Sequence, residues 1–285
     1  TTPATAATAP ERGAAPGPLA GQWQVSVTEL DARGRDAAQP WFSARDVTVQ
    51  ATLDSTGALV QAGAAAGRAS LLGAAVTWRD ARYAAARDGQ PAQMTLDAEL
   101  EPLAVAPWLS RLQPDAGFGG DLTVKGRVVV KHQQAFDADI VLERAGGDLA
   151  VTTDGVTQPL GLTDLRLAMA ASDGTWHFTQ AVAGANLGVL AGAQSLRVSP
   201  QATWPAPQTP MQGVLEWRVA DLGVWAPFTP PGWRVGGTLR TSAALGGRFG
   251  APEIEGRMEG SGLSLRNLLQ GVDVRDGELA LSLRG

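Results

Sequence analysis

Few residues of this chain have the types and spacing that chemistry requires. The sequence holds two histidines, His132 and His177, and no cysteine. A histidine that binds zinc or acts as a general base needs partner groups at short, fixed spacing, and neither histidine has them. We expect His132 to lie at a strand end and His177 within a sheet, both as structural residues. The absence of cysteine excludes disulfides, thiolate catalysis and cysteine-based zinc sites.

Two further motifs resemble sites by residue type alone. Asp137-Ala-Asp139 offers paired carboxylates, as a calcium site or an acid–base pair requires. In a strand both side chains share one face, opposite Phe136 and Ile140, and we expect that face to be solvated. The glycine-rich segment Gly246–Gly250 lies between strands and opens no helix, so it does not fit a nucleotide-binding loop. The sequence therefore predicts a protein that is not an enzyme and holds no cofactor and no metal.

The composition favours a β-rich protein without a charged binding surface. Of 285 residues, 44% are apolar and 18% are charged, and 35 are glycine and 18 proline. A typical soluble domain has about 25% charged residues. The net charge is −5 and no basic run occurs, which argues against nucleic acid as a partner and against electrostatic docking on anionic lipid. No apolar stretch reaches the length of about 18 residues that indicates a membrane-spanning helix.

Strict alternation of apolar and polar residues in short runs is the dominant pattern. Residues 121–131, 253–259 and 278–284 show it most clearly. A period of two indicates strands, because successive side chains point to opposite faces of a sheet. The sequence therefore predicts an all-β fold: an elongated, curled antiparallel or mixed sheet, groove-like or solenoid-like, with one or two short helices.

Turn signals and two helix signals divide the strands. Type I′ hairpin turns need positive φ at both central residues, which Asp-Gly pairs supply. The predicted hairpin turns are Asp88-Gly89, Asp154-Gly155, Asp173-Gly174 and Asp276-Gly277. Segments 103–113 and 221–228 are predicted to form short helices, the second with Asp221 as its N-cap.

The chain divides into a leading segment and one long β unit. Residues 1–20, rich in Ala, Thr, Pro and Gly, are predicted to be a disordered linker. Residues 21–285 are predicted to be an elongated β-groove segment of a longer polypeptide. Within it, residues 104–220 and 221–285 form a degenerate repeat. At an offset of 117 residues the matching positions are Trp108 and Trp225, Pro114 and Pro231, Gly119-Gly120 and Gly236-Gly237, and Leu122 and Leu239.

The apolar face of such a sheet must be covered. It can pack as a closed core, or it can curl and leave a lipid-sized groove, and both arrangements use the same period. Small residues on the apolar side leave room and allow curvature, which favours the groove. These small residues are Ala51, Gly126, Ala138, Gly237 and Gly256. The candidate groove-lining residues are Leu122, Val124, Val128, Val130, Ile140, Leu239, Ile254, Met258, Leu279, Leu281 and Leu283.

A recurring rhythm of glycines and strands marks residues 232–281. It consists of a strand with Gly236-Gly237-Thr238-Leu239, the turn Phe249-Gly250-Ala251-Pro252, a strand ending in Gly256-Arg257, then Gly262-Leu263 and the hairpin Asp276-Gly277. This rhythm resembles that of the TamB family, within the wider AsmA-like group. Residues 105–170 resemble it more loosely, with Phe136 in place of the Phe-Gly-x-Pro turn, and residues 1–100 share the general pattern.

The resemblance implies a cellular location and a function for the parent protein. The parent protein would cross the periplasm of a Gram-negative bacterium as a curled β-sheet with an apolar groove. An N-terminal helix, expected outside this chain, would anchor it in the inner membrane. Its C-terminal end, also expected outside this chain, would meet an outer-membrane barrel partner, TamA. The implied roles are phospholipid transport to the outer membrane and the assembly and secretion of outer-membrane proteins, with phospholipid acyl chains or apolar unfolded strands as partners.

Two other classes of function are compatible with the same pattern. A chaperone-like interaction module would bind outer-membrane protein strands by β-augmentation, and an exposed, uncharged sheet edge would favour it. A secreted β-solenoid adhesin or glycan binder would present coplanar, exposed tryptophans from among the nine in the chain.

Overall fold

The computed structural model describes residues 20–35, 40–87, 89–114, 117–153, 155–185, 187–230 and 232–285. Residues 1–19 of the predicted linker lie outside the described residues. So do Asp88 and Asp154 of the predicted turns and Pro231 of the predicted repeat.

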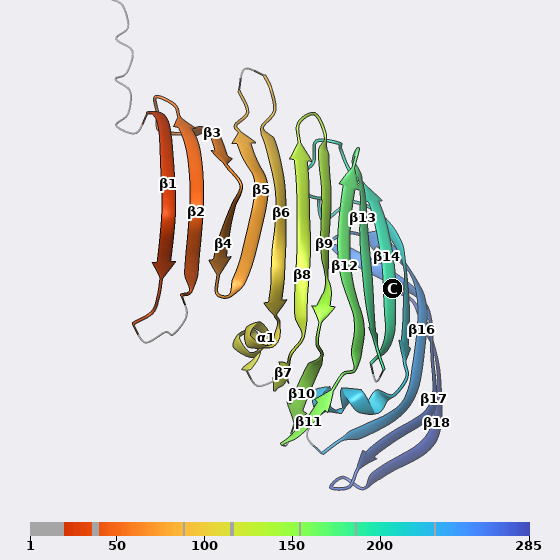
Figure 1. Cartoon of the computed structure of the whole chain (residues 1–285). Helices are drawn as coiled ribbons and strands as arrows, with labels where there is room; N and C mark the ends of the chain where they lie inside the picture. The colour runs from red at the N-terminus through yellow and green to blue at the C-terminus, as the bar shows by residue number, and fades with distance from the viewer. Residues whose placement is uncertain are drawn as a thin grey trace, which may run out of the picture.

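One large curled antiparallel sheet of fifteen strands makes up most of the fold (Figure 1). Neighbouring strands in the sheet follow one another in the chain from β1 to β18. The short strand β4 lies next to β3 and, like β3, pairs with both β2 and β5. The strands are β1 (Gly21–Ala32), β2 (Phe42–Leu53), β3 (Leu59–Ala64), β4 (Gly67–Leu71), β5 (Ala74–Ala84), β6 (Gln93–Ala104), β8 (Thr123–His132), β9 (Phe136–Gly146), β12 (Leu162–Ser172), β13 (Thr175–Gly184), β14 (Gly188–Arg197), β15 (Met211–Val219), β16 (Arg234–Arg248), β17 (Ala251–Asn267) and β18 (Val272–Leu283). The predicted all-β fold with a curled sheet is thus confirmed.

A small sheet and two helical turns complete the described residues. The small sheet has the order β11 (Val156–Pro159), β10 (Leu149–Thr153) and β7 (Phe118–Gly120). Helix α1 (Ala106–Leu112) begins with a proline in its first turn, where no backbone donor is needed. The 3-10 helix η2 (Leu222–Phe228) is preceded by Asp221, whose Oδ1 accepts a 2.8 Å hydrogen bond from the Gly223 amide. The two predicted helical segments are confirmed, the second as a 3-10 helix.

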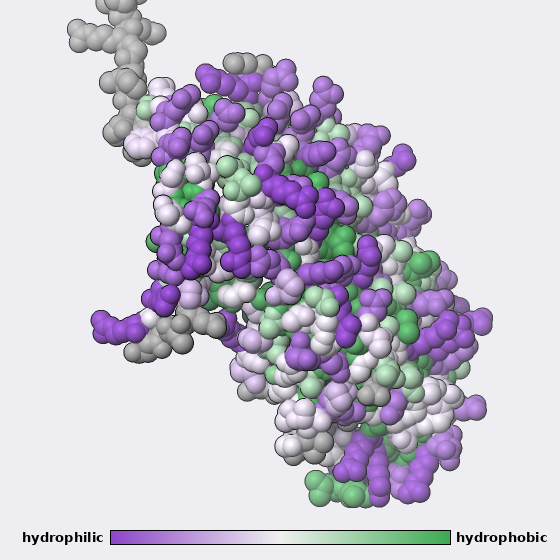
Figure 2. Space-filling model, viewed as in Figure 1, coloured by the Kyte–Doolittle hydropathy of each residue, from purple (hydrophilic) through white to green (hydrophobic). Residues whose placement is uncertain are grey.

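The register separates an apolar face from a polar face. Between β8 and β9, Val130 lies opposite Ala138 and Val128 lies opposite Ile140. On the other face of the same strands, Lys125 and Glu143 are paired, with 3.3 Å between Nζ and Oε1. We call the apolar face the inner face and the polar one the outer face. Figure 2 shows the outer face as a largely hydrophilic surface.

The sheet curls toward its inner face. Phe178 on β13 and Phe249 in the β16–β17 turn have ring centroids 5.8 Å apart although two strands, β14 and β15, separate β13 from β16. Trp204, from the segment between β14 and β15, contacts both rings. Register shifts add local curvature, among them those at Gly236/Thr238 and Gly260/Leu263. In Figure 1 the strands β16 to β18 accordingly curve round behind the central strands.

A cluster of aromatic rings covers the inner face along one margin, at the β8–β9 and β12–β13 turns. We call it the aromatic cluster, and its rings belong to His132, Phe136, Trp176, Phe178, Trp204 and Phe249. Trp176 is 1% exposed and stacks on Phe136 with ring centroids 5.4 Å apart. Val130, Ala138, Ala171 and Leu196 are buried beneath these rings. This margin of the strands is therefore closed.

The opposite margin is closed by the small sheet and η2. Val151 on β10, Leu160 after β11 and Val224 on η2 are buried together, with Trp225 packed against them. Asp148 ties the small sheet to the main one: its Oδ1 accepts hydrogen bonds from the Leu149 and Leu162 amides, both at 2.8 Å. We call this the lower cluster. The two clusters leave the middle rows of the inner face between them.

One predicted turn is confirmed and another is wrong. Asp173 and Gly174 have φ of 46° and 73° and connect β12 to β13, as a type I′ turn requires. Asp276 also has positive φ, but Asp276-Gly277 lies inside β18, where Gly277 faces Leu263 across a register shift. The pair is a bulge because β17 is long enough to pair with the residues on both sides of it.

Two matching glycines of the predicted repeat share a positive φ angle. Gly120 and Gly237 have nearly the same φ, 101° and 104°. An added Cβ would lie 2.3 Å from the Asp148 carbonyl at Gly120 and 2.7 Å from the Gly262 carbonyl at Gly237. Both sites therefore require glycine. They differ in context, since Gly120 ends β7 in the small sheet and Gly237 lies within β16.

Replacing Trp176 tests the aromatic cluster. We expect Trp176→Ala to lower the free energy of unfolding by about 3–5 kcal/mol, because it leaves a cavity among packed rings. Trp41→Ala is the matched control, since Trp41 is 50% exposed, and we expect a change within about 1 kcal/mol. Urea unfolding followed by circular dichroism measures both. Equal losses in the two variants would show that the cluster does not stabilise the fold.

Candidate ligand-binding face

A continuous row of paired residues crosses the middle of the inner face. Each member lies directly opposite the next across a strand pair, from β1 to β18. We call it the floor row: Leu30, Ala44, Ala69, Val76, Leu100, Gly126, Leu142, Leu167, Gln180, Gly192, Leu215, Ala243, Gly256 and Leu283. All but Gln180 are apolar or glycine, so the row forms an apolar track perpendicular to the strands.

Large apolar side chains on the inner face remain exposed away from the two clusters. Leu167 in the floor row is 40% exposed, and Leu281 on β18 is 47% exposed. Trp23 and Val25 on β1 are 45% and 56% exposed. A closed core would bury side chains of this size. The inner face is therefore covered along its margins and accessible along its middle and at β1 and β18.

The structure places the eleven predicted groove-lining residues in three environments. Leu122, Val124 and Val130 are buried, and Val130 belongs to the residues beneath the aromatic cluster. Ile254 and Leu281 are exposed. The half-buried ones are Val128, Ile140, Leu239, Met258, Leu279 and Leu283. The buried three therefore do not form part of an accessible surface.

Three residues of the inner face were not predicted from the sequence. They are Leu167, the most accessible one on the central strands, and the polar residues Gln180 and Gln194. Leu167 follows Leu165 at strand spacing on β12, and that alternation identifies its face. Gln180 and Gln194 occupy inner-face positions that the alternation assigns to apolar residues. In the run Trp176, Phe178, Gln180 the glutamine departs from the pattern, and this was the available signal.

The other chemically interesting residues lie apart from one another. His132 ends β8 on the inner face beside Phe136, whereas His177 is exposed on the outer face. Asp137 and Asp139 are both exposed on the outer face of β9. Among the described residues no group of three or more His, Asp or Glu side chains has a geometry that could hold a metal ion. The arrangement assembles no reactive centre from these candidates.

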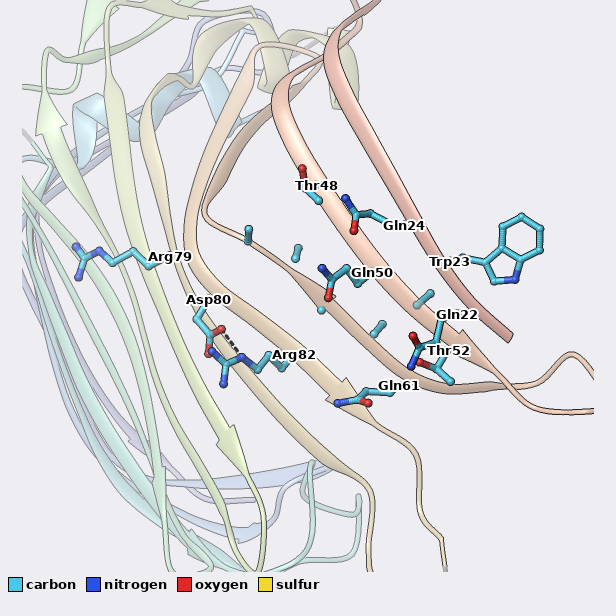
Figure 3. A pocket seen from close by; sticks show the side chains of 15 residues that line it. Gln22, Trp23, Gln24, Thr48, Gln50, Thr52, Gln61, Arg79, Asp80 and Arg82 are labelled. Atoms are coloured by element: carbon cyan, nitrogen blue, oxygen red, sulfur yellow. Dashed lines mark ion pairs between the residues drawn. The ribbon is translucent and has the colours of Figure 1, made fainter. Parts of the chain in front are cut away.

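A hollow of about 810 Å³ lies over β1, β2, β3 and β5 (Figure 3). Its polar lining is rich in amides and hydroxyls: Gln22, Gln24, Thr48, Gln50, Thr52 and Gln61. Asp80 and Arg82 form a 2.8 Å ion pair at its side. In Figure 3 the Trp23 ring points away from these glutamines. This hollow of the outer face is therefore suited to water.

Ion pairs reinforce the polar character of the outer face. Arg68 donates hydrogen bonds of 2.6 and 2.8 Å to the Glu101 carboxylate, and these bonds hold the pKa of Glu101 below its usual value. Arg275 lowers the pKa of Asp273 in the same way. Such carboxylates stay charged at neutral pH and favour solvent over an apolar ligand.

Comparisons with family models, with curated proteins and with solved structures found no match to this chain. Within the described residues, no helix combines the length and the apolar character that crossing a bilayer requires. The function must therefore be argued from the geometry of the inner face and from the sequence.

Substitution of two inner-face leucines tests whether the middle of the face is accessible. Leu196 is 5% exposed beneath the aromatic cluster, and we expect Leu196→Ser to cost about 3–5 kcal/mol of unfolding free energy. Leu167→Ser should cost about 1 kcal/mol or less, because that side chain is already partly in solvent. Chemical denaturation of both variants provides the comparison. A loss at Leu167 as large as that at Leu196 would mean that the middle of the face is a closed core.

Proposed function

We propose that this chain is a non-enzymatic lipid-binding segment whose inner face forms an apolar groove for acyl chains. The observation that carries the proposal is the floor row, an apolar track across the whole sheet with accessible leucine side chains. An apolar surface of this extent, bordered by polar surface, is typical of a binding site rather than of a surface left in water.

The dimensions of the floor row suit acyl chains. Its members come from successive strands, which give thirteen inter-strand steps of about 4.8 Å and a length on the order of 60 Å. The hydrocarbon core of a bilayer is about 30 Å thick, so one acyl chain occupies about half of that. The track is therefore long enough for several chains in succession, as a conduit requires.

The energetics also favour acyl chains. Each methylene transferred from water to an apolar surface contributes about 0.8 kcal/mol. A dozen methylenes would contribute about 10 kcal/mol before the cost of ordering the chain. The charged outer face keeps the sheet in water while the ligand stays on the opposite side.

The resemblance of residues 232–281 to the TamB family supports a proposal for the cellular setting of this groove. We propose a periplasmic segment of an inner-membrane-anchored protein of a Gram-negative bacterium that moves phospholipid to the outer membrane and supports outer-membrane protein assembly and secretion. A TamA-like barrel would be the partner of the longer protein, at a portion other than this segment. The curled sheet supports this setting, because such a protein needs an extended apolar path through an aqueous compartment.

A second function, the binding of outer-membrane protein strands by β-augmentation, is favoured by one observation. The edge strand β1 has no charged residue and no proline from Gly21 to Thr28. Such an edge offers unpaired backbone groups to an incoming strand. A glycan-binding role is less suited to the structure, because Trp176 with Trp204 and Trp217 with Trp225 are near perpendicular rather than coplanar.

Charged substitutions on opposite faces test the proposed groove. We expect the chain purified from a Gram-negative host to carry phospholipid, detected by native mass spectrometry and lipid extraction. Leu167→Asp combined with Leu281→Asp should reduce that lipid at least about tenfold, because a carboxylate does not tolerate an acyl chain beside it.

The control places the same change on the outer face. Val189 and Val214 are 49% and 60% exposed there, so Val189→Asp with Val214→Asp should leave the bound lipid unchanged. Circular dichroism checks that both variants are folded. A wild-type chain that carries no lipid and takes up none from vesicles would refute the lipid-binding proposal, and equal lipid loss in both variants would refute the inner face as its site.

A further inference from the structure

Two glutamines on neighbouring strands interrupt two central rows of the inner face. Gln180 on β13 is the polar member of the floor row, and Gln194 on β14 is the polar member of the adjacent row. That second row consists of Gly67, Trp78, Ala98, Val128, Ile140, Met169, Phe178, Gln194, Gly213, Leu245 and Ile254. The polar members of two otherwise apolar rows are therefore neighbours.

The two side-chain amides bond each other reciprocally. Gln180 Nε2 donates to Gln194 Oε1 at 2.7 Å, and Gln194 Nε2 donates to Gln180 Oε1 at 3.1 Å. A carboxamide has two N–H donors and an oxygen with two lone pairs. The reciprocal pairing uses one donor and one lone pair of each amide. One N–H per glutamine remains able to donate to a further acceptor, and both side chains are only partly buried.

Two glycines make the space that the pair occupies. Gly192 lies opposite Gln180 and Gly213 lies opposite Gln194. A Cβ at Gly192 would be 2.6 Å from Gln180 Oε1, and a Cβ at Gly213 would be 2.8 Å from Gln194 Cγ. A side chain at Gly192 would therefore displace the amides, and one at Gly213 would also meet the Ala193 carbonyl oxygen, 2.5 Å away. The two glutamines and the two glycines therefore form one local arrangement on the floor of the proposed groove.

Strand register does not account for this feature. The backbone ladder between β13 and β14 already pairs every residue from Thr175–Arg197 to Gly184–Gly188 without a shift. Two leucines would fill the same place without the desolvation cost that amides bear on an apolar surface. A ligand that accepts hydrogen bonds from the remaining N–H groups would offset that cost.

We propose that the Gln180–Gln194 pair binds the ester carbonyl groups of an acyl lipid whose chains lie along the floor row. The inference rests on the proposed lipid-binding function and adds its chemical class, an ester-linked lipid. Ester carbonyls accept hydrogen bonds and lie next to the acyl chains, so they reach the amides when the chains contact Leu167 and Leu215 on either side. A hydrocarbon chain without an ester offers the amides no acceptor.

A competition between two lipids of equal chain length tests this inference. The purified full chain is mixed with vesicles that contain equal amounts of diacyl and dialkyl phosphatidylcholine, which differ in their carbonyl groups. Bound lipid is extracted and the ratio of the two forms is measured by mass spectrometry. We expect the wild-type chain to retain the diacyl form about fivefold to tenfold over the dialkyl form, which corresponds to one or two net hydrogen bonds.

Two double variants complete the experiment. Gln180→Leu with Gln194→Leu should bring the ratio to about one while total bound lipid stays within about twofold, because the apolar contacts remain. Gln24→Leu with Gln50→Leu replaces a directly paired glutamine couple on the outer face and should keep the wild-type ratio. A wild-type ratio near one with lipid bound would overturn the ester-binding inference and leave the proposed function standing. A wild type that binds neither lipid would overturn both.

Discussion

Coverage of one apolar sheet face is the constraint on which the structure depends. A single antiparallel sheet pairs the backbone groups of its inner strands, but it leaves an apolar face that no second large sheet of the described residues covers. The chain buries the two margins of that face, one under the aromatic cluster around Trp176 and one under the small sheet and η2. These two clusters hold the curl, and the curl gives the middle of the face its shelter. Stability and an accessible apolar surface thus come from different parts of the same strands.

The middle of the inner face is shaped by small residues as much as by large ones. Ala44, Gly126 and Ala243 each lie next to a leucine in the floor row, so small and large side chains are interspersed along the track. The same positions allow strands to bend, because they do not crowd the concave side. Gly192 and Gly213 serve a different purpose, since they make room for the paired amides of Gln180 and Gln194. The residue at each position of these rows therefore determines how strongly the sheet can bend there and whether the inner face is apolar or polar.

The alternation of apolar and polar residues was enough to predict the sheet and the face on which most residues lie. It could not predict which inner-face residues are buried, because burial depends on contacts with distant segments. The alternation assigned Val128 and Ile140 to one face and Asp137 to the other, and the register agrees. It could not separate Val130, buried under the aromatic cluster, from Leu167, which is accessible, because Trp204 and Phe249 reach that margin from distant segments. It also took Asp276-Gly277 for a turn, since nothing local reveals that β17 continues beyond it.

Site-specific crosslinking is the measurement that tests the central claim most directly. A photoreactive amino acid is placed at Ile140 or Leu215 on the inner face, and at Val141 or Glu216 on the outer face, in a Gram-negative host. After irradiation the crosslinked species are identified by mass. The account predicts phospholipid adducts at the two inner positions and none at the outer ones. Inner positions that crosslink only to other residues of the same chain would show a closed core and contradict it.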